Sequence, residues 1–225
     1  MSEPQRWVIA VLGGTGAEGS GLATRWAHAG HRVILGSRSA DKAQQAAQAL
    51  NAQLGGDRVS GMDNAAATAA ANVVVLAVPY SAQRPTIEDV KGALAGKILI
   101  DVTVPLVPPR VSRVQLPSGG SAVEAMQALL GEQTRVVSAF QNVSAHYLSD
   151  LQKKIDCDVL VCGDDKEARE VAVQLAGDAG LRGVHAGVLA NSAASEALTS
   201  ALIAINRHYK VPAAGIRITG VFDKE

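Results

Sequence analysis

The sequence has few cysteines and few aromatic side chains. Two of its 225 residues are cysteine, and Phe, Trp and Tyr together make up 3%. Two cysteines exclude the disulfide framework of a small secreted domain. Cys157 and Cys162 stand five positions apart in a strand-like run, an odd spacing that sends their side chains to opposite faces. With no C-x-x-C pair and five scattered histidines, we expect two buried thiols and no metal site.

An excess of charge of either sign is also missing. The 21 basic and 21 acidic residues give a formal net charge of zero, and they are interspersed. Neither a nucleic-acid partner nor an acidic lipid surface is indicated by such a pattern. No apolar run approaches the length of a membrane span, and the first residues, MSEPQRW, lack the apolar core of a signal peptide. We expect a soluble cytoplasmic protein that binds small molecules.

Glycine is abundant, and three glycines form a recognisable turn. Gly14, Gly16 and Gly19 have G-x-G-x-x-G spacing, directly after the apolar run 7–12 and before a helical pattern. In a dinucleotide site the first glycine permits the tight turn, the second lets the backbone approach the pyrophosphate, and the third lets helix and strand pack closely. The Thr15 hydroxyl could bind a phosphate oxygen. The alternative is an ordinary glycine turn that binds nothing.

The end of the next expected strand, 32–35, indicates which dinucleotide is bound. An NAD site has an Asp or Glu there, about 20 residues beyond the glycines, to bind the ribose hydroxyls. This chain has Ser37 and Arg38 instead, with Lys42 one helical turn further on. A hydroxyl and a guanidinium suit the extra phosphate of NADP, which a carboxylate would repel. We therefore predict NADPH, although a Ser-Arg pair that merely caps the next helix, near Asp41, is an alternative.

Strand and helix patterns alternate along the rest of the chain, which predicts a Rossmann-like α/β fold with a doubly wound, mostly parallel sheet. We expect an NADP-binding domain over residues 1–145. Residues 146–225 would form a C-terminal extension that packs on the same sheet and closes the substrate crevice. The expected strands are 7–12, 32–35, 58–60, 72–78, 97–102, 135–140, 158–162 and 181–185.

Helices are expected between these strands and at the end of the chain. Ser121 and Glu124 form a capping box for a helix over 122–130, and Asp164 with Asp165 would cap a helix over 166–179. The last helix, 192–208, carries an apolar stripe that we expect to be buried. That stripe consists of Ala194, Leu198, Ala201, Leu202 and Ile205.

Ligands of a doubly wound sheet bind at the carboxyl ends of its strands. The segments expected there are 13–16, 37–38, 78–80, 103–108 and 141–146, and they are mostly apolar or neutral. They contain no Ser-His-Asp order, no closely spaced pair of carboxylates and no lysine placed as a Schiff base. Hydride transfer needs none of these, because the cofactor carries the chemistry and the protein holds two redox rings together away from water.

Several motifs, taken in order, resemble one family from about residue 7 to the end. The chain is similar to the NADPH-dependent reductases of the deazaflavin coenzyme F420. The resemblance rests on GGTGAEGSGLA, LGSR followed by Lys42, AVPY, VPLVPP, RVVSAF, VLVCGDD, HAGVLANS and AAGIRITG. It departs from the archaeal pattern at Ser144, where those relatives carry proline, and in the segment 100–104.

The resemblance implies reversible hydride exchange between NADP(H) and F420, without a covalent intermediate, in a protein that is typically a homodimer. Residues matching the NADP-holding positions are Thr15, Ser37, Arg38, Lys42, Val78 and Pro79. Those matching the deazaflavin pocket are Val107, Val143, Ala145 and Ala214. In addition, Arg110 and Arg113 could meet the anionic tail of F420.

Two other functions stay open from the residues alone. The first is an NADPH-dependent reductase of another small organic acceptor, a carbonyl or an imine, with His146 or Tyr80 as proton donor. The second is an NADPH-sensing protein that catalyses nothing. A histidine in such a place more often makes only a local hydrogen bond, and the ordinary pKa of tyrosine, about 10, makes Tyr80 a better shield than acid. Asp101, at the end of its strand, fits either a turn or a functional role.

Overall fold

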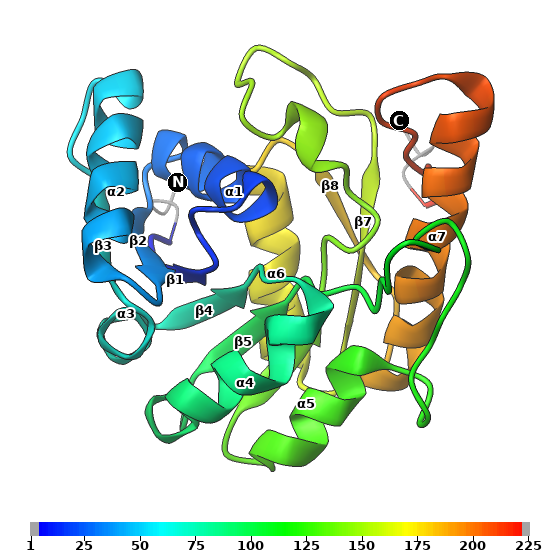
Figure 1. Cartoon of the computed structure of the whole chain (residues 1–225), viewed down its shortest axis with the longest axis horizontal. Helices are drawn as coiled ribbons and strands as arrows, with labels where there is room; N and C mark the ends of the chain where they lie inside the picture. The colour runs from blue at the N-terminus through cyan, green and yellow to red at the C-terminus, as the bar shows by residue number, and fades with distance from the viewer. Residues whose placement is uncertain (1–4, 222–225) are drawn as a thin grey trace.

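Eight strands form one sheet within residues 5–221, the part of the chain that this computed structural model describes (Figure 1). The strands are β1 (Val8–Leu12), β2 (Arg32–Ser37), β3 (Val59–Asp63), β4 (Val73–Leu76), β5 (Ile98–Asp101), β6 (Arg135–Ser138), β7 (Asp158–Gly163) and β8 (Arg182–His185). The helices are α1 (Ala17–His28), α2 (Ala40–Leu54), α3 (Asn64–Ala70), α4 (Tyr80–Val90), α5 (Ala122–Leu130), α6 (Lys166–Asp178) and α7 (Ser192–Tyr209). Three short 3-10 turns are η1 (Lys91–Ala93), η2 (Ala145–Tyr147) and η3 (Leu189–Asn191).

The strand order is β3-β2-β1-β4-β5-β6-β7-β8. Neighbouring strands pair in parallel except β6 and β7, which are antiparallel. The predicted doubly wound, mostly parallel sheet extended by later strands is thus confirmed. Because the chain runs outward from β1 to β3 and then returns to β4, the order reverses between β1 and β4. Connections leave these two strands in opposite directions there, which opens a crevice at their carboxyl ends.

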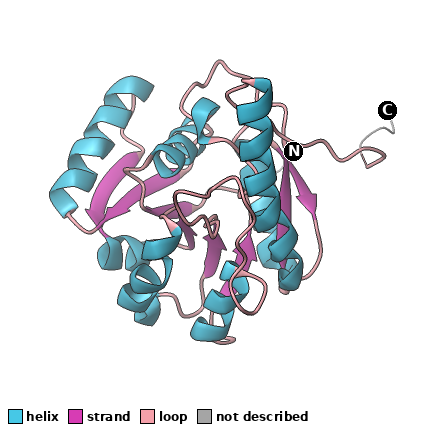
Figure 2. Cartoon of the chain, turned by 45° about the vertical axis from the view of Figure 1, so that its right-hand side comes forward, coloured by secondary structure: helices cyan, strands magenta, loops and turns pink. Residues whose placement is uncertain are grey.

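Central strands are buried on both faces because helices lie on both sides of the middle of the sheet (Figure 2), whereas the edge strands β3 and β8 are partly exposed. In β1, Ile9 and Val11 belong to one core, and Ala10 and Leu12 belong to the other. This alternation follows from the two-residue period of a strand. Helices α1, α2 and α6 supply apolar side chains to the first core, and α3, α4 and α5 supply them to the second. No helix in residues 5–221 is long and apolar enough to cross a membrane.

Some element boundaries differ from those expected. β3 continues to Asp63 instead of ending at Ser60, because pairing with β2 extends to the register Ser37 with Asp63. Serine, glycine and aspartate are weak strand formers, so the local sequence hid this extension. The Asp63 side chain also accepts the N–H of Ala66, at 2.8 Å, and so caps α3.

The buried face of α7 is polar, so the predicted burial of its apolar stripe is wrong. Ala194 and Ala201 are exposed, and Ile205 is 40% exposed. Of the predicted stripe, only Leu202 is fully buried. The buried positions of this helix are Ser192, Ser195, Glu196, Ser200 and Leu202.

Glu196 explains why α7 turns this side inward. Its carboxylate, 1% exposed, accepts the Ser121 hydroxyl at 2.7 Å and the backbone N–H groups of Ala122 at 2.8 Å and Val123 at 3.2 Å. These N–H groups belong to the first turn of α5, where a negative charge is favoured. Burial still raises the pKa of Glu196, and the nearby carboxylate of Asp101 adds to this. Helix α7 is therefore positioned by a hydrogen-bond network rather than by apolar packing.

Candidate functional site

The glycine-rich turn has the shape that a dinucleotide needs. α1 begins just after Gly16, which is its N-cap residue and has no side chain that could accept a hydrogen bond. The first backbone N–H groups of the helix are therefore left without a side-chain acceptor and can bind an anion. A Cβ at Gly19 would lie 2.6 Å from the Gly13 carbonyl oxygen. One at Gly14 would lie 2.8 Å from the Val11 carbonyl oxygen. The close approach of α1 to β1 therefore requires glycine at both positions.

A cavity of about 600 Å³ opens beside this turn, and we call it the glycine-turn cavity. Thr15 and Gly16 line it, as do Ser37 and Arg38 at the end of β2. Asn64, the first residue of α3, also lines it, and its buried Oδ1 has no hydrogen-bond partner within the described residues. Asn64 was missed in the sequence, because the expected strand ended at residue 60 and left Asn64 four positions beyond it.

Ser39, rather than Ser37 or Arg38, caps α2. The Ser39 hydroxyl accepts the N–H of Lys42 at 3.4 Å, and the Ser37 hydroxyl accepts the N–H of Ser39 at 3.3 Å. Arg38 is exposed at the cavity wall, and Lys42 is exposed in the first turn of α2 without lining the cavity. The guanidinium of Arg38 is thus not needed to end the helix, which leaves it available for an anion.

A second cavity, of about 590 Å³, adjoins the first, and we call it the valine-lined cavity. Both cavities are lined by Gly16, Ala77, Val78, Pro79 and Ser81, so they meet over the carboxyl ends of β1 and β4. Six valines line the second cavity: Val78, Val102, Val104, Val107, Val111 and Val143. A long, mostly apolar space that begins over Val78 and Pro79 suits two flat rings lying against each other.

Gln141 is a buried polar side chain in the wall of the valine-lined cavity, held in place by residues behind the wall. Gln141 is 2% exposed; its Nε2 donates to the Asp101 carbonyl at 2.7 Å, while its Oε1 has no partner in the described chain. Asp101 is fully buried and accepts the N–H of Thr103 at 2.9 Å and the Nε2 of Gln83 at 2.7 Å. Burial raises the pKa of Asp101. Asp101 therefore holds the turn at the end of β5 and, through its carbonyl, the position of Gln141 in the cavity wall.

The four residues predicted to line the deazaflavin pocket do not all line the same cavity. Val107 and Val143 line it, whereas Ala145, in η2, lines neither cavity. Ala214 lines a separate cavity of about 210 Å³, together with Ser144. The alternative proton donors are also separated: Tyr80 lines the valine-lined cavity, but His146 is exposed and packs edge-on against Tyr147.

The two aspartates after β7 have separate structural roles. Asp165 caps α6 as predicted, since it accepts the N–H of Ala168 at 2.7 Å. Asp164 does not join it, because its Oδ1 accepts the N–H of Leu189 at 3.0 Å and so holds the turn η3. Within residues 5–221 no group of three His, Cys, Asp or Glu side chains could hold a metal ion.

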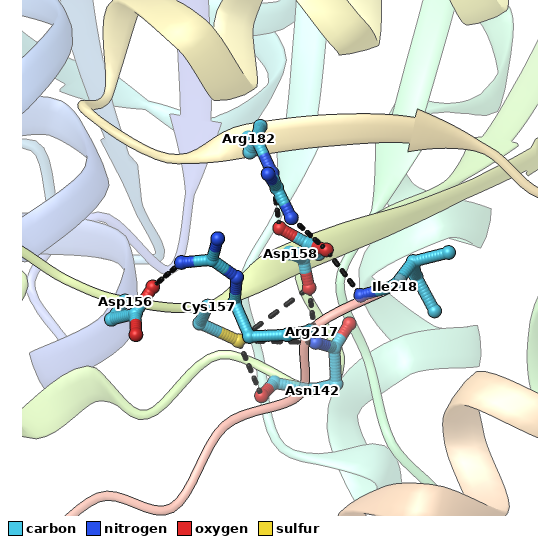
Figure 3. Close-up of polar contacts among 7 residues, drawn as sticks. All are labelled: Asn142, Asp156, Cys157, Asp158, Arg182, Arg217 and Ile218. Carbon is cyan, nitrogen blue, oxygen red and sulfur yellow. Dashed lines mark hydrogen bonds and ion pairs between the residues drawn. The ribbon is translucent and has the colours of Figure 1, made fainter. Parts of the chain in front are cut away.

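Asp158 fastens the C-terminal segment that carries Ala214 (Figure 3). Its carboxylate, almost fully buried, binds the Arg182 guanidinium through two hydrogen bonds of 2.6 and 2.7 Å. The same carboxylate accepts the N–H of Ile218 at 2.6 Å, and the Asp158 N–H donates to the Ile216 carbonyl at 2.8 Å. Beside it, Arg217 pairs with Asp156. The hydrogen bonds from Arg182 lower the pKa of Asp158.

Replacing Asp158 by asparagine is expected to lower the free energy of unfolding at pH 7 by about 2–4 kcal/mol, since it removes the charge from the two hydrogen bonds with Arg182. The folded-state pKa lies below the ordinary 3.8, so the carboxylate stabilises the fold above pH 3.8. This contribution is lost as pH falls through the lowered pKa. Urea unfolding at pH 7 and pH 3 should show a gap between wild type and variant that narrows at pH 3. A gap of constant size would contradict the role assigned to the charge.

The glycine turn, the doubly wound sheet and the two adjoining cavities are those of a dinucleotide-binding α/β protein, and the named relatives make its class that of the NADP-dependent oxidoreductases. More narrowly, the chain belongs to the family of coenzyme F420-dependent NADP oxidoreductases, whose family model matches residues 8–105. The F420-dependent NADP reductase of Methanocaldococcus jannaschii is 41% identical over 95% of this chain and 98% of its own length. That of Methanothermobacter thermautotrophicus is 42% identical over 96% of this chain and 97% of its own.

A solved structure has the same architecture over nearly the whole chain. It comes from Arthrobacter sp. FB24, is described as a candidate F420-dependent NADP-reductase, and superposes with a TM-score of 0.77. It is 26% identical and covers 94% of this chain and 99% of its own. The family resemblance, the α/β fold and the expectation of an NADPH-dependent oxidoreductase are confirmed by these findings.

Proposed function

We propose that this protein transfers a hydride reversibly between NADP(H) and coenzyme F420. The observation that carries the proposal is the junction of the two cavities over Val78 and Pro79. A dinucleotide whose phosphates lie at the start of α1 must pass this junction to bring its nicotinamide into the valine-lined cavity. The relatives that match over nearly their full length are named as F420-dependent NADP reductases, which supplies the second substrate.

Residues of the glycine-turn cavity would hold NADP. Gly14, Gly16 and Gly19 would shape the turn, Thr15 would bind a phosphate oxygen, and the unpartnered Oδ1 of Asn64 would accept a hydrogen bond from the cofactor. The extra phosphate of NADP would be bound by Ser37, Arg38 and Lys42. When bound, NADPH supplies the hydride chemistry, and the chain's own role is to orient it and exclude water.

The valine-lined cavity would hold the deazaflavin ring. Val107 and Val143 offer flat apolar contacts, and the unpartnered Oε1 of Gln141 would accept an N–H of the ring. Arg110 and Arg113 are exposed on the loop whose Pro108 and Val111 line this cavity, which suits the anionic tail of F420. Ala145 and Ala214 would have to act from beyond the cavity wall.

The distribution of the cavity walls along the chain also supports a domain boundary between residues 145 and 146. Residues 1–145 contain the glycine turn and most of the walls of both cavities. In the C-terminal part, 146–225, Thr199 of α7 lines the valine-lined cavity and donates to the Gln141 carbonyl at 2.7 Å. We propose that this part closes the substrate crevice, and that the protein works in the cytoplasm.

The direct test mixes the purified protein with NADPH and oxidised F420 without oxygen and follows the visible absorbance of the deazaflavin. Rapid bleaching with NADPH, and slow or no bleaching with NADH, is expected. Tight NADPH binding without bleaching would contradict F420 as the acceptor and favour another organic acceptor or a sensing role.

We further propose that the protein is a homodimer whose interface includes the exposed side of α7. Ile205, Tyr209 and Val211 are 40%, 69% and 41% exposed, and the neighbouring loop exposes Val114. Hydrogen bonds from Ser200 and Arg207 hold that loop against α7, so Val114 follows directly on a segment attached to this helix. An apolar surface made of one helix and one loop suits a second copy of the same surface related by a two-fold axis.

Replacing Ile205 by arginine is therefore expected to convert the dimer to a monomer, because two like charges would face each other across the axis. Light scattering coupled to gel filtration measures this mass. Replacing the exposed Ala52 of α2, away from α7, by arginine should leave the dimer intact. A wild-type protein of monomeric mass would refute the proposal.

A further inference from the structure

Glu18 lies where the two proposed substrates would meet. It is the second residue of α1, partly buried, and it lines the valine-lined cavity next to Gly16, which belongs to both cavities. Among the residues lining that cavity, Glu18 has the single carboxyl group, and Tyr80 is the one other titratable side chain. Its carboxyl oxygens are not among the buried atoms that lack a partner, so they keep contact with solvent, while the valine-rich wall beside them removes part of their hydration.

Glu18 has no partner that would explain its position. Within residues 5–221 its carboxyl group forms no hydrogen bond or ion pair with another side chain or with the backbone. Burial against the apolar wall raises the pKa of Glu18 to about 8. The partial positive charge at the start of α1 acts in the opposite direction, but loss of water dominates. With a pKa raised in this way, Glu18 would hold a proton at neutral pH that it can give up.

We propose that Glu18 is the acid–base residue that supplies, and in the reverse direction takes back, the proton that accompanies hydride transfer; this rests on the proposed function. NADPH gives a hydride, which is two electrons and a proton, and becomes NADP⁺. The acceptor ring that gains the hydride gains one negative charge. Transfer of the carboxyl proton from Glu18 to the ring cancels this charge, and the resulting Glu18 carboxylate regains a proton from water. Atoms and electrons balance without a further reactant.

The arrangement also couples the proton to cofactor binding. The pyrophosphate of NADPH, bound at the start of α1, brings negative charge close to Glu18, which disfavours the carboxylate. Binding of NADPH should therefore keep Glu18 protonated until the acceptor arrives. Tyr80, from α4, is the titratable group that lines the same cavity from another element.

The test compares Glu18→Gln, which keeps the shape but cannot release a proton, with wild type. We expect kcat for acceptor reduction to fall about 100-fold, and the plot of kcat against pH to lose its descending limb near pH 8. The Kd of NADPH should change less than about threefold. Glu124→Gln is the matched control, because Glu124 is likewise an acid in the first turn of a helix but lines neither cavity. Its rate and pH profile should equal those of wild type.

A second readout does not depend on turnover. In protein carrying ¹³C at the glutamate carboxyl carbons, one resonance should titrate near pH 8, move to higher pH with NADPH, and be absent from Glu18→Gln. An unchanged rate and pH profile in Glu18→Gln, or the absence of such a resonance, would overturn the proposal. If wild type fails to reduce F420 at all, the proposed function fails, whereas the resonance still decides whether Glu18 holds its proton near neutral pH.

Discussion

Arg25→Met is expected to lower the free energy of unfolding by about 3–5 kcal/mol, one of the largest losses a single substitution in this chain should cause. Arg25 lies on α1 and is 6% exposed. Its guanidinium donates to five backbone carbonyls, those of Tyr147, Leu148, Asp150, Lys153 and Ala179, at 2.7 to 3.1 Å.

The size of the effect follows from the acceptors that remain. A buried carbonyl that loses its donor costs about 1–3 kcal/mol, and water can reach only some of these five. Four of them belong to the segment 147–153, which has no regular structure beyond η2. Within the segment, the Tyr147 carbonyl accepts the N–H of Asp150 at 3.3 Å, and the Asp150 carbonyl accepts the N–H of Lys153 at 3.1 Å. Arg25 is therefore the donor on which the carbonyls of Leu148 and Lys153 depend most. Methionine fills a similar volume but offers no donor.

Thermal and urea unfolding would measure this loss, and a decrease in melting temperature of about 6–20 °C is expected for a chain of this length. Arg25→Lys should recover part of the stability, because an ammonium group has three donors and no planar fork. Arg32→Met, at an exposed position, is the control and should change stability by less than about 0.5 kcal/mol. A loss below 1 kcal/mol for Arg25→Met would mean that the 147–153 segment finds other donors.

Local pattern was sufficient for most of the fold. Apolar runs predicted the central strands, because buried parallel strands must be apolar on both faces. Alternation with helices then predicted a doubly wound, mostly parallel sheet, whereas the order of its strands comes from the structure. The outlying error was β3, where pairing with β2 overrides the weak strand preference of its last residues.

Long-range polar contacts were the part that the sequence concealed. The apolar stripe of α7 predicted its buried side, yet Glu196 and Ser192 face inward because they bind the start of α5, 71 to 75 positions earlier in the chain. A single sequence contains no sign of that partner. Arg25 is a comparable case, since its acceptors lie more than 120 positions away.

The candidate site likewise contains residues that local sequence predicted and residues that only the folded structure reveals. Residues held by the glycine turn and the end of β2 are local in sequence, and the structure brings Thr15, Ser37 and Arg38 to one cavity as expected. Asn64, Gln141 and Glu18 were not singled out, because each acquires its chemical character only from the neighbours that bury it. An unpartnered oxygen or an isolated acid is a property of the folded chain.

Arg38→Ala is expected to raise the KM for NADPH about 10- to 100-fold while leaving the KM for NADH within about twofold. The extra phosphate of NADP carries the charge that distinguishes the two cofactors, and a charge-assisted hydrogen bond contributes about 1.5–3 kcal/mol. Arg38 lines the glycine-turn cavity but does not cap α2, so its removal should not disturb the helix. Steady-state kinetics with both cofactors, alongside an unfolding curve, would separate binding from stability.

The other end of the same strand supplies the control. Arg32 is the first residue of β2, and Arg38 directly follows its last residue; both are exposed. Arg32→Ala therefore removes an equal charge at the opposite end of the strand, away from the glycine-turn cavity. It should leave the KM for both cofactors unchanged. Adding Ser37→Asp to Arg38→Ala should go further and reverse the preference, because a carboxylate at this position binds ribose hydroxyls and repels the phosphate. Equal losses for NADPH and NADH in Arg38→Ala would show instead that Arg38 acts on a part common to both cofactors, such as the pyrophosphate, and that the selectivity for NADP arises elsewhere in the cavity.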